Sequence, residues 1–452
     1  MYIRIIQIIP INYPGLFENL VLECVYRIYH KCSINNFGSS KLFLEVYKIC
    51  CVVWEGMHLT YVERVKTLRD ELIEYRRFLH SNAEVGMNLP ITQNFVMEKL
   101  REFGCEPNVI GKFGVAVTIG KKSGNVILLR ADMDALPMVE ESDLDFASNN
   151  GSAHTCGHDL HTTMLLGAAK MLIENETQLE GAVKLLFQPG EETFEGAKAM
   201  IADGILENPK VDAALAVHVG AGKLPIGTYL YNNENTMMLS NDGFKISVKG
   251  SGAHGAYPHF SIDPINIASH IYLGLQTLIA REVDPFEQCV LTVGSFVAGT
   301  APNIIPETAT MQGTLRTSSP KTRERMLKRL REVVDFTATT YQGTASVEIL
   351  SEVAPLICNP SFTNDVLKYI KTLPLDNLTG YPKIQSSASD DFAEILRLVP
   401  GAYLYLSAGF TDDTETYQAH HPKVRFNEDV IPFGAAALAH CATQWLIEHQ
   451  DS

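Results

Sequence analysis

The segment HTCGHDLH, from His154 to His161, gathers three histidines, one cysteine and one aspartate within eight residues. Imidazole nitrogen, thiolate sulfur and carboxylate oxygen are the usual protein ligands of zinc and similar divalent ions. A metal site is therefore the first chemistry that this segment suggests. Short clusters of this kind also occur without a ligand, so the segment alone does not establish a site.

Further donor groups follow segments that have the composition of buried strands. They are Asp132 and Asp134 in RADMDALP, Glu191 and Glu192 in QPGEE, His218 in AVHVG, and His420 and His421 in QAHHPKVRF. Because ligands of open parallel sheets bind beyond the carboxyl ends of the strands, we expect these groups to converge on one crevice. Each alone has a plainer interpretation, since a strand-end histidine is often structural and the HH pair suits a solvated turn.

The adjacent carboxylates Glu191 and Glu192 favour a catalytic site over a structural one. A structural zinc site is closed by four protein ligands, mainly Cys and His, and does not need a free carboxylate. In a catalytic site, one carboxylate of such a pair binds the ion and the other accepts a proton from the attacking water. The alternative is a solvated acidic turn, which the apolar strand before the pair disfavours.

The elements that must position these groups alternate between helix and strand. Hydrophobic periodicity predicts helices at 61–80, 92–103, 160–174 and 195–204, and strands at 115–120, 125–134, 182–189 and 213–220. Such alternation indicates an α/β fold with a mostly parallel central sheet flanked by helices. We expect Asp159 to be the N-cap of the third helix.

The order of elements changes after about Ser240. It becomes strand, helix, strand, strand, helix, strand, which is the βαββαβ order of ferredoxin-like domains. We therefore expect a catalytic α/β domain in two parts, 57–240 and 353–452, interrupted by an inserted ferredoxin-like domain at 241–352.

Two nucleotide-binding motifs and one serine motif fail. GSGAHG at 250–255 matches GxGxxG, but Pro258 blocks the helix that would hold a pyrophosphate. GVAVTIGKKS has five residues between its glycines where a phosphate loop has four, and Lys122 occupies the Ser/Thr position. The sequence contains no GxSxG, so a serine hydrolase has no support.

Charge and cysteine content exclude several classes of partner. The chain has 37 basic and 52 acidic residues, and its net charge of −15 repels phosphate backbones and anionic membrane surfaces. We expect neither nucleic acid nor a membrane as a partner. The nine cysteines are an odd number without paired spacing, which favours a reducing, cytoplasmic location.

Residues 1–56 differ from the rest, because they contain no Ala, Asp or Thr. Charges interrupt every apolar run before it reaches the ~18–20 residues of a membrane span, and no signal-peptide cleavage site follows. We expect this extension to lie outside the fold and the functional chain to begin near Met57.

The motifs taken together resemble a known family. In chain order they are RRFLHSNAEVG, LLRADMDALP, HTCGHDLHTTMLLGAA, FQPGEE, AVHVG, KGSGAHGAYPH, APNIIPETATMQGTLR, SASDDFA and HHPKVRFNED. This pattern resembles the amidohydrolase branch of the aminoacylase and carboxypeptidase metallopeptidase family, which includes hippurate hydrolases, N-acetyl-diaminopimelate deacetylases and plant auxin-conjugate hydrolases. The resemblance runs from about Met57 to the C-terminus.

The resemblance implies roles for individual residues. The implied ligands of one or two divalent metal ions are Cys156, His158, Glu192, His218 and His420. Glu191 is implied as the general acid and base, and Asp132 and Asp134 as residues that support the ligands from behind. The inserted domain is implied to be a lid and dimerisation domain. Its His254 would reach into the partner's active site to stabilise the oxyanion, and its Asn303 would contact substrate.

The implied activity is metal-dependent hydrolysis of the amide bond of N-acyl amino acids, such as N-acetyl or N-benzoyl conjugates, by a homodimer. Manganese or zinc suits the donor set, and nickel or cobalt is also compatible. A metallo-dipeptidase or aminopeptidase and a non-catalytic metal-binding protein are the alternatives. PGEE in place of the commoner PAEE, and SDDF in place of SEDF, leave the ligands intact but alter the surroundings of the substrate.

Overall fold

The computed structural model describes residues 60–121, 123–375, 378–412 and 414–450. The expectation about residues 1–56 lies outside the described residues. The elements below belong to one compact unit that spans Arg64–Ser452, except that the first helix begins three residues earlier.

The larger sheet has eight strands in the order β1-β2-β4-β3-β5-β16-β6-β15. Their bounds are β1 Asn108–Ile110, β2 Gly114–Gly120, β3 Val126–Asp132, β4 Ala182–Gln188, β5 Ala213–Gly220, β6 Thr228–Leu230, β15 Thr379–Tyr381 and β16 Gly401–Ser407. The central strands β4, β3, β5 and β16 run parallel, and antiparallel pairs occur toward both edges. The predicted mostly parallel sheet is confirmed.

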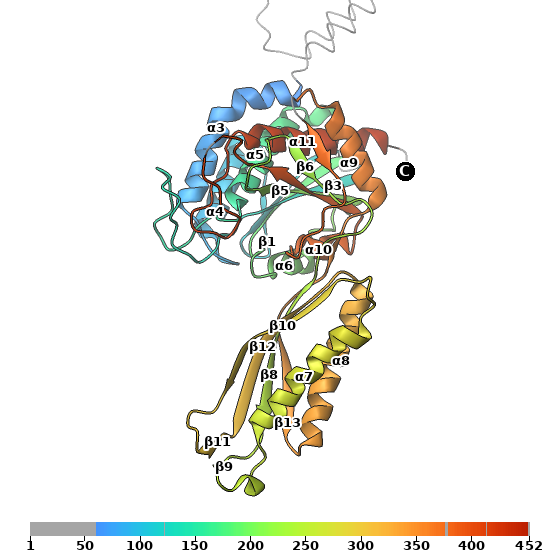
Figure 1. Ribbon diagram of the computed structural model, residues 1–452. Helices are drawn as coiled ribbons and strands as arrows, with labels where there is room; N and C mark the ends of the chain where they lie inside the picture. The colour runs from blue at the N-terminus through green and yellow to red at the C-terminus, as the bar shows by residue number, and fades with distance from the viewer. Residues whose placement is uncertain (1–59, 122, 376–377, 413, 451–452) are drawn as a thin grey trace, which may run out of the picture. The chain divides into compact units, whose positions relative to one another are not determined.

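Helices cover both faces of this sheet (Figure 1). Their bounds are α3 Tyr61–Ser81, α4 Pro90–Glu102, α5 His158–Glu174, α6 Gly196–Ala202, α9 Pro360–Thr372, α10 Phe392–Leu396 and α11 Val430–Glu448, with a short 3₁₀ turn at Glu176–Gln178. On one face α5 and α11 pack against each other and against β3 and β5, and on the other α6 and α10 close a second apolar core. Every residue of β3 and β4 is buried as a result, which explains their predominantly apolar sequences.

Helix α11 is long and apolar enough to cross a membrane by composition alone. In this fold, however, it is a core helix whose apolar side chains pack on α5, α9 and the sheet. Its hydrophobicity is therefore explained by burial inside the protein.

The second sheet belongs to residues 241–353, which we call the insert. Its elements are β8 Asn241–Lys249, α7 Pro264–Glu282, β10 Cys289–Ala298, β12 Thr308–Thr317, α8 Pro320–Thr340 and β13 Thr344–Val353. The four strands are antiparallel in the order β10-β12-β8-β13, and α7 and α8 pack on the sheet. This arrangement is the ferredoxin-like topology predicted from the order of elements.

Two small ribbons complete the structure. In the insert, β9 Ala253–His254 pairs with β11 Ile304–Ile305 next to the 3₁₀ turn Pro258–Phe260. Where the chain passes between the two sheets, β7 Thr236–Met238 pairs with β14 Leu356–Ile357.

Three helices begin with the same local device, a polar cap followed by proline. Asp263 accepts hydrogen bonds from the backbone N–H groups of Ile265 and Asn266 at the start of α7. Ser319 and Asn359 each accept one such bond at the starts of α8 and α9. Proline fits the first helical position because its missing N–H has no partner there anyway.

Candidate metal centre

The predicted donors stand at one edge of the larger sheet. Strand β3 ends at Asp132, β4 is followed by Glu191 and Glu192, and β5 carries His218 near its end. Since β4, β3 and β5 are adjacent and parallel, their carboxyl ends meet at the same edge.

A tight turn before α5 adds two more donors. Gly157 is the residue before the helix and has a left-handed backbone with φ of +87°. A Cβ at this position would lie 2.4 Å from the Cγ2 atom of Val219 on β5. Only glycine allows this close approach, which presents Cys156 and His158 to the end of the strand. The helix thus begins at His158, so the expected N-cap role of Asp159 is wrong, and Asp159 lies inside the first turn.

The last donor comes from the C-terminal segment. His420 has a left-handed backbone with φ of +68°, which is uncommon for a residue with a side chain. Its backbone N–H donates to the carbonyl oxygen of Thr155 at 3.0 Å. His421 instead stacks on Tyr417, with ring centroids 4.2 Å apart. Of the two histidines, the structure therefore brings His420 to the cluster.

The distances between donor atoms suit a shared ion. Sγ of Cys156 lies 3.4 Å from Nε2 of His218 and 3.4 Å from Nε2 of His420. Oε1 of Glu192 lies 3.4 Å from Nε2 of His420 and 3.9 Å from Nε2 of His158. Ligands at 2.0–2.3 Å from one tetrahedral ion are separated by roughly 3.3–3.8 Å. Each of the five predicted ligands thus has a donor atom 3.4–3.9 Å from a donor atom of another, which is close to the spacing that a shared ion requires.

Some of the buried polar atoms without a hydrogen-bond partner belong to this cluster. Among the described residues, both ring nitrogens of His158 and Oε1 of Glu192 are buried without a hydrogen-bond partner. Leaving such groups unpaired costs free energy, so a protein retains them where something else binds them. A divalent ion satisfies a buried imidazole and a buried carboxylate together. The residues present therefore fit a metal.

Two of the predicted ligands have protonation states that would suit metal binding. Nδ1 of His218 lies 2.8 Å from the carbonyl oxygen of Val219, which only accepts, so Nδ1 carries the proton and Nε2 is a free acceptor. Burial lowers the pKa of His218, which keeps the ring neutral. Burial raises the pKa of the Cys156 thiol to about 12, so its thiolate form depends on a nearby cation.

Asp134 and Asp132 lie behind these donors. The carboxylate of Asp134 accepts the backbone N–H groups of Glu191 at 3.0 Å and Glu192 at 3.1 Å. It also lies 3.6 Å from Nδ1 of His158. Asp132 lies 2.5 Å from Nδ1 of His161, whose Nε2 accepts the N–H of Val219. Both aspartates thus orient the segments that carry the ligands.

Glu191 is buried beside the cluster, with Oε2 3.8 Å from Nε2 of His158. Burial, then repulsion by Asp390 and Glu192, raises the pKa of its carboxyl well above the ordinary value. A carboxylate with a raised pKa is a better proton acceptor at neutral pH than an exposed one.

Sequence reasoning missed the counter-ion of this acidic region. The guanidinium of Arg130 on β3 contacts Asp132 at 2.5 Å, Asp391 at 2.9 Å and Asp390 at 3.2 Å, and all four side chains are buried. The signal was present, because an arginine inside the apolar run NVILLRAD must find an acidic partner. The two aspartates of SASDDFA, Asp390 and Asp391, are such partners, although the motif gave no indication of this role.

His254 and Asn303 lie on the insert, and their contacts are with the insert itself. His254 pairs with Ile304 across β9 and β11, and its ring lies 5.4 Å from that of Tyr257. The carbonyl oxygen of Asn303 accepts the N–H of Gly255 at 2.8 Å. The two are therefore neighbours on one loop cluster, and neither contacts the metal ligands of this chain in the described residues.

Residues 128–444 match the family model described as Peptidase family M20/M25/M40. The chain belongs to this family. The match includes every residue of the donor cluster, so the resemblance found in the motifs is confirmed. This M20-family chain is accordingly a metal-dependent hydrolase of amide bonds.

Curated relatives of this M20-family chain include plant and bacterial enzymes. It is 35% identical over 389 residues to IAA-amino acid hydrolase ILR1-like 5 of Arabidopsis thaliana, covering 85% of this chain and 88% of that one. It is also 35% identical over 392 residues to N-acetyl-L-cysteine deacetylase of Bacillus subtilis, covering 86% and 91%.

Solved structures share its fold. A putative aminohydrolase from methicillin-resistant Staphylococcus aureus matches with a TM-score of 0.80 and 32% identity, covering 85% of this chain and 98% of that one. A Bacillus subtilis protein described as a dinuclear metal binding peptidase of the M20 family matches with a TM-score of 0.71 and 30% identity, covering 84% and 99%.

Proposed function

We propose that this M20-family chain hydrolyses the amide bond of N-acyl amino acids, releasing a carboxylic acid and a free amino acid. The proposed ligands of one or two divalent ions are Cys156, His158, Glu192, His218 and His420. The observation that carries the proposal is the position of Glu191, a buried carboxylate 3.8 Å from His158 that the ligand set does not use. A protein that only stored metal would not need it.

The chemistry divides between the ion and the protein. A bound divalent ion would polarise the amide carbonyl and lower the pKa of a water from 15.7 toward ~7. The Glu191 carboxylate accepts the proton of the attacking water and then donates it to the departing amine nitrogen. Asp134 holds Glu191 in place through the backbone N–H of that residue, at 3.0 Å.

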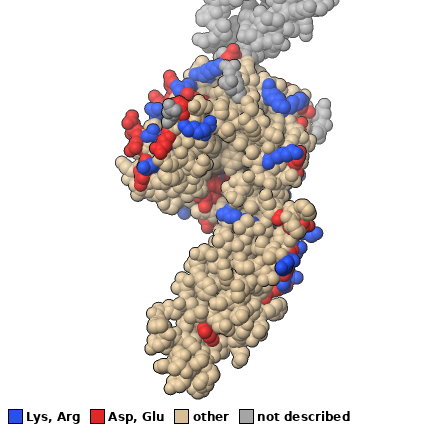
Figure 2. Space-filling model, in the orientation of Figure 1, with Lys and Arg blue, Asp and Glu red and all other residues tan. Residues whose placement is uncertain are grey.

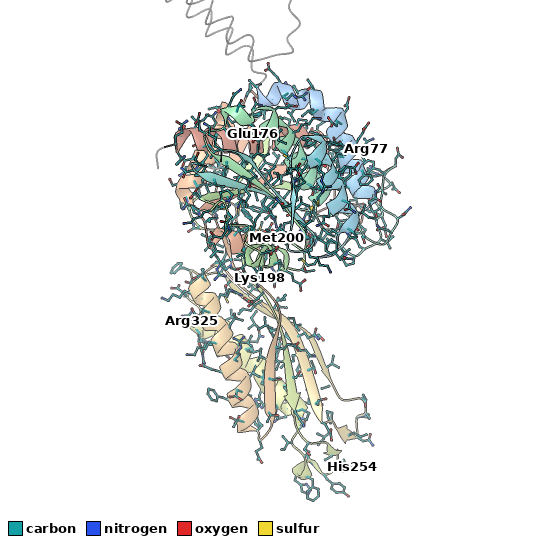
Figure 3. All side chains as sticks on the ribbon, turned by 180° about the vertical axis from the view of Figure 1, so that it is seen from behind. Arg77, Glu176, Lys198, Met200, His254 and Arg325 are labelled. Carbon is teal, nitrogen blue, oxygen red and sulfur yellow. The ribbon has the colours of Figure 1, made fainter. Side chains whose placement is uncertain are left out.

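We further propose that the oxyanion is stabilised by His254 of a second subunit. The His254 ring is exposed on the insert (Figure 3), and a hydrogen bond from the N–H of Ala256 to its Nδ1 leaves Nε2 to carry the ring proton. That N–H is a suitable donor to a developing oxyanion. The backbone carbonyl oxygen of Asn303 accepts the N–H of Gly255, the residue after His254, so Asn303 would contact the substrate from the same loop cluster.

The surface of the insert supports a homodimer. Strand β10 is an edge of the four-stranded sheet and exposes Phe296 and Val297, and the neighbouring helix α7 exposes Tyr272 and Leu273. The face of the insert drawn in Figure 2 carries few charged side chains. An apolar strand edge of this kind is typical of surfaces that pair with a second chain.

The donor set suits several metals. One thiolate, three imidazoles and one carboxylate bind zinc or manganese, and nickel or cobalt also accepts such ligands. Metal analysis of the purified protein, followed by chelation and restoration with each ion, identifies the one that supports hydrolysis.

A substrate screen tests the proposal. N-acetyl and N-benzoyl amino acids, dipeptides with a free amino terminus and aminoacyl amides are each offered to the metal-loaded protein. We expect hydrolysis of the N-acyl amino acids to be fastest and to disappear with chelation. Faster cleavage of dipeptides or aminoacyl amides would favour a metallo-dipeptidase or aminopeptidase, and metal binding without hydrolysis of any of them would favour a non-catalytic protein.

A further inference from the structure

A buried ionic network lies directly behind the first turn of α5. Oδ2 of Asp159 accepts a hydrogen bond from Nε of Arg76 at 2.9 Å and lies 2.9 Å from Nδ1 of His80. Nε2 of His80 lies 2.9 Å from Oε1 of Glu140, and Nη1 of Arg76 lies 3.1 Å from Oε1 of Glu428. The side chains of Arg76, His80 and Asp159 are at most 5% exposed.

The network joins segments that carry metal ligands. Arg76 and His80 are four residues apart on α3, so they project from one face of that helix. Asp159 immediately follows His158, and Glu428 lies in the segment between His420 and α11. One face of α3 thus holds both the helix that carries His158 and the segment that carries His420.

His158 itself has no hydrogen bond to fix its ring within the described residues. Metal-ligating histidines are normally oriented by a hydrogen bond to the second ring nitrogen. Here the nearest acceptor, Oδ1 of Asp134, lies 3.6 Å away. The direction of the His158 ring therefore depends on the position of its backbone, which is held on one side by the close packing of Gly157 on Val219 and on the other by the buried bonds of Asp159.

We propose that Arg76 and His80 are positioning residues for the metal centre, acting through Asp159 to fix His158 against the other ligands. The inference rests on the proposed function, because it requires that His158 binds a metal. It assigns a task to Arg76 and His80, whose removal from water carries a desolvation cost that ion pairing offsets only in part.

Arg77 provides a matched control. It lies on α3 (Figure 3) directly after Arg76 in the sequence, and it forms an ion pair with the same Glu428 at 2.7 Å. Its side chain is 50% exposed, and the partner that its guanidinium shares with Arg76 is Glu428, not Asp159. Arg77→Met therefore removes a similar charge from the same helix without touching the anchor of His158.

The test measures the metal dissociation constant by competition with a chelating dye for Arg76→Met, His80→Gln and Arg77→Met. The visible spectrum of the cobalt-loaded proteins reports ligand geometry independently of turnover. We expect about 10- to 100-fold weaker binding and an altered cobalt spectrum for Arg76→Met and His80→Gln, and less than about threefold change for Arg77→Met. If Arg76→Met does not fold, His80→Gln decides.

Wild-type affinity and spectrum in His80→Gln would overturn the inference while leaving the proposed function standing. Equal weakening in all three variants would also overturn it, since the ion pair of Arg77 is with Glu428 and not with Asp159. A wild-type protein that binds no metal would instead contradict the proposed function.

Discussion

Sγ of Cys156 and Nε2 of His420 lie 3.4 Å apart although 264 positions separate the two residues in the chain. The contact depends on two left-handed residues, Gly157 beside the cysteine and His420 itself. The candidate metal centre is thus assembled where a loop before α5 meets the segment before α11.

Gly157→Ala is expected to weaken metal binding. Its Cβ would stand 2.4 Å from Cγ2 of Val219, and relief of this clash moves Cys156 and His158 away from His218. Gly151→Ala is the control, because Gly151 also has a positive φ, +85°, but nothing lies within 4 Å of its Cβ. The control should lose about 1 kcal/mol of stability and keep its metal affinity, measured by dye competition. Equal affinity of both variants for metal would contradict the clash argument.

Arg130→Met is expected to destabilise the protein by about 3–5 kcal/mol, because it leaves Asp132, Asp390 and Asp391 buried without a counter-charge. Urea unfolding measures the free energy. Arg397→Met, which removes a 58% exposed arginine paired with Glu394, should cost less than about 1 kcal/mol. A similar loss of unfolding free energy in the two variants would show that the buried network stabilises the fold no more than an exposed ion pair does.

His80 should stabilise the fold more at low than at high pH. Burial alone would lower its pKa, but hydrogen bonds to Asp159 and Glu140 outweigh burial and the repulsion of Arg76, and raise the pKa above 6.5. The neighbouring ring of His154 is neutral, since burial lowers its pKa to about 3. Because the pKa of His80 is higher in the folded than in the unfolded chain, its charged form stabilises the fold. This stabilisation is fully present below pH 6.5, the unfolded pKa, and is lost as the pH rises through the folded pKa.

Urea unfolding of wild type and His80→Gln at pH 6 and at pH 9 checks this expectation. The difference in unfolding free energy between the two proteins should be larger at pH 6. A difference that is constant, or larger at pH 9, would mean that His80 is neutral in the folded protein.

His254→Ala is expected to lower kcat about 100- to 1,000-fold without changing metal content. If His254 acts on the partner's site, a mixture of His254→Ala and Glu191→Gln subunits regains activity, because some mixed dimers hold one complete site. Each variant alone remains inactive. Mixtures that stay inactive after subunit exchange would place His254 outside the partner's site.

Much of this architecture was predictable from sequence because the decisive patterns are local. Predominantly apolar runs such as NVILLRAD and AVKLLFQP predicted buried parallel strands, and the expected convergence of Asp132, Glu192 and His218 agrees with the adjacency of those strands in the structure. The βαββαβ order likewise predicted the topology of the insert.

The residues that sequence reasoning missed have partners that lie far away in the chain, although Arg130 also contacts the nearby Asp132. Arg76 and Asp159 are 83 positions apart, and Arg130 and Asp391 are 261 apart. Periodicity shows which face of α3 is buried, but it does not show which charged residue of another segment packs against that face. The N-cap prediction was wrong for the same reason. Aspartate is a common N-cap residue, but the carboxylate of Asp159 is bonded to Arg76 and His80 of α3.

The central claim is that Glu191 does chemistry at a metal held by other residues, and one paired measurement on Glu191→Gln tests it most directly. Metal stoichiometry and the hydrolysis rate of an N-acyl amino acid are determined on the same preparation. We predict wild-type metal content with a rate reduced at least about 100-fold. Hydrolysis at the wild-type rate, or loss of the metal together with activity, would contradict this account.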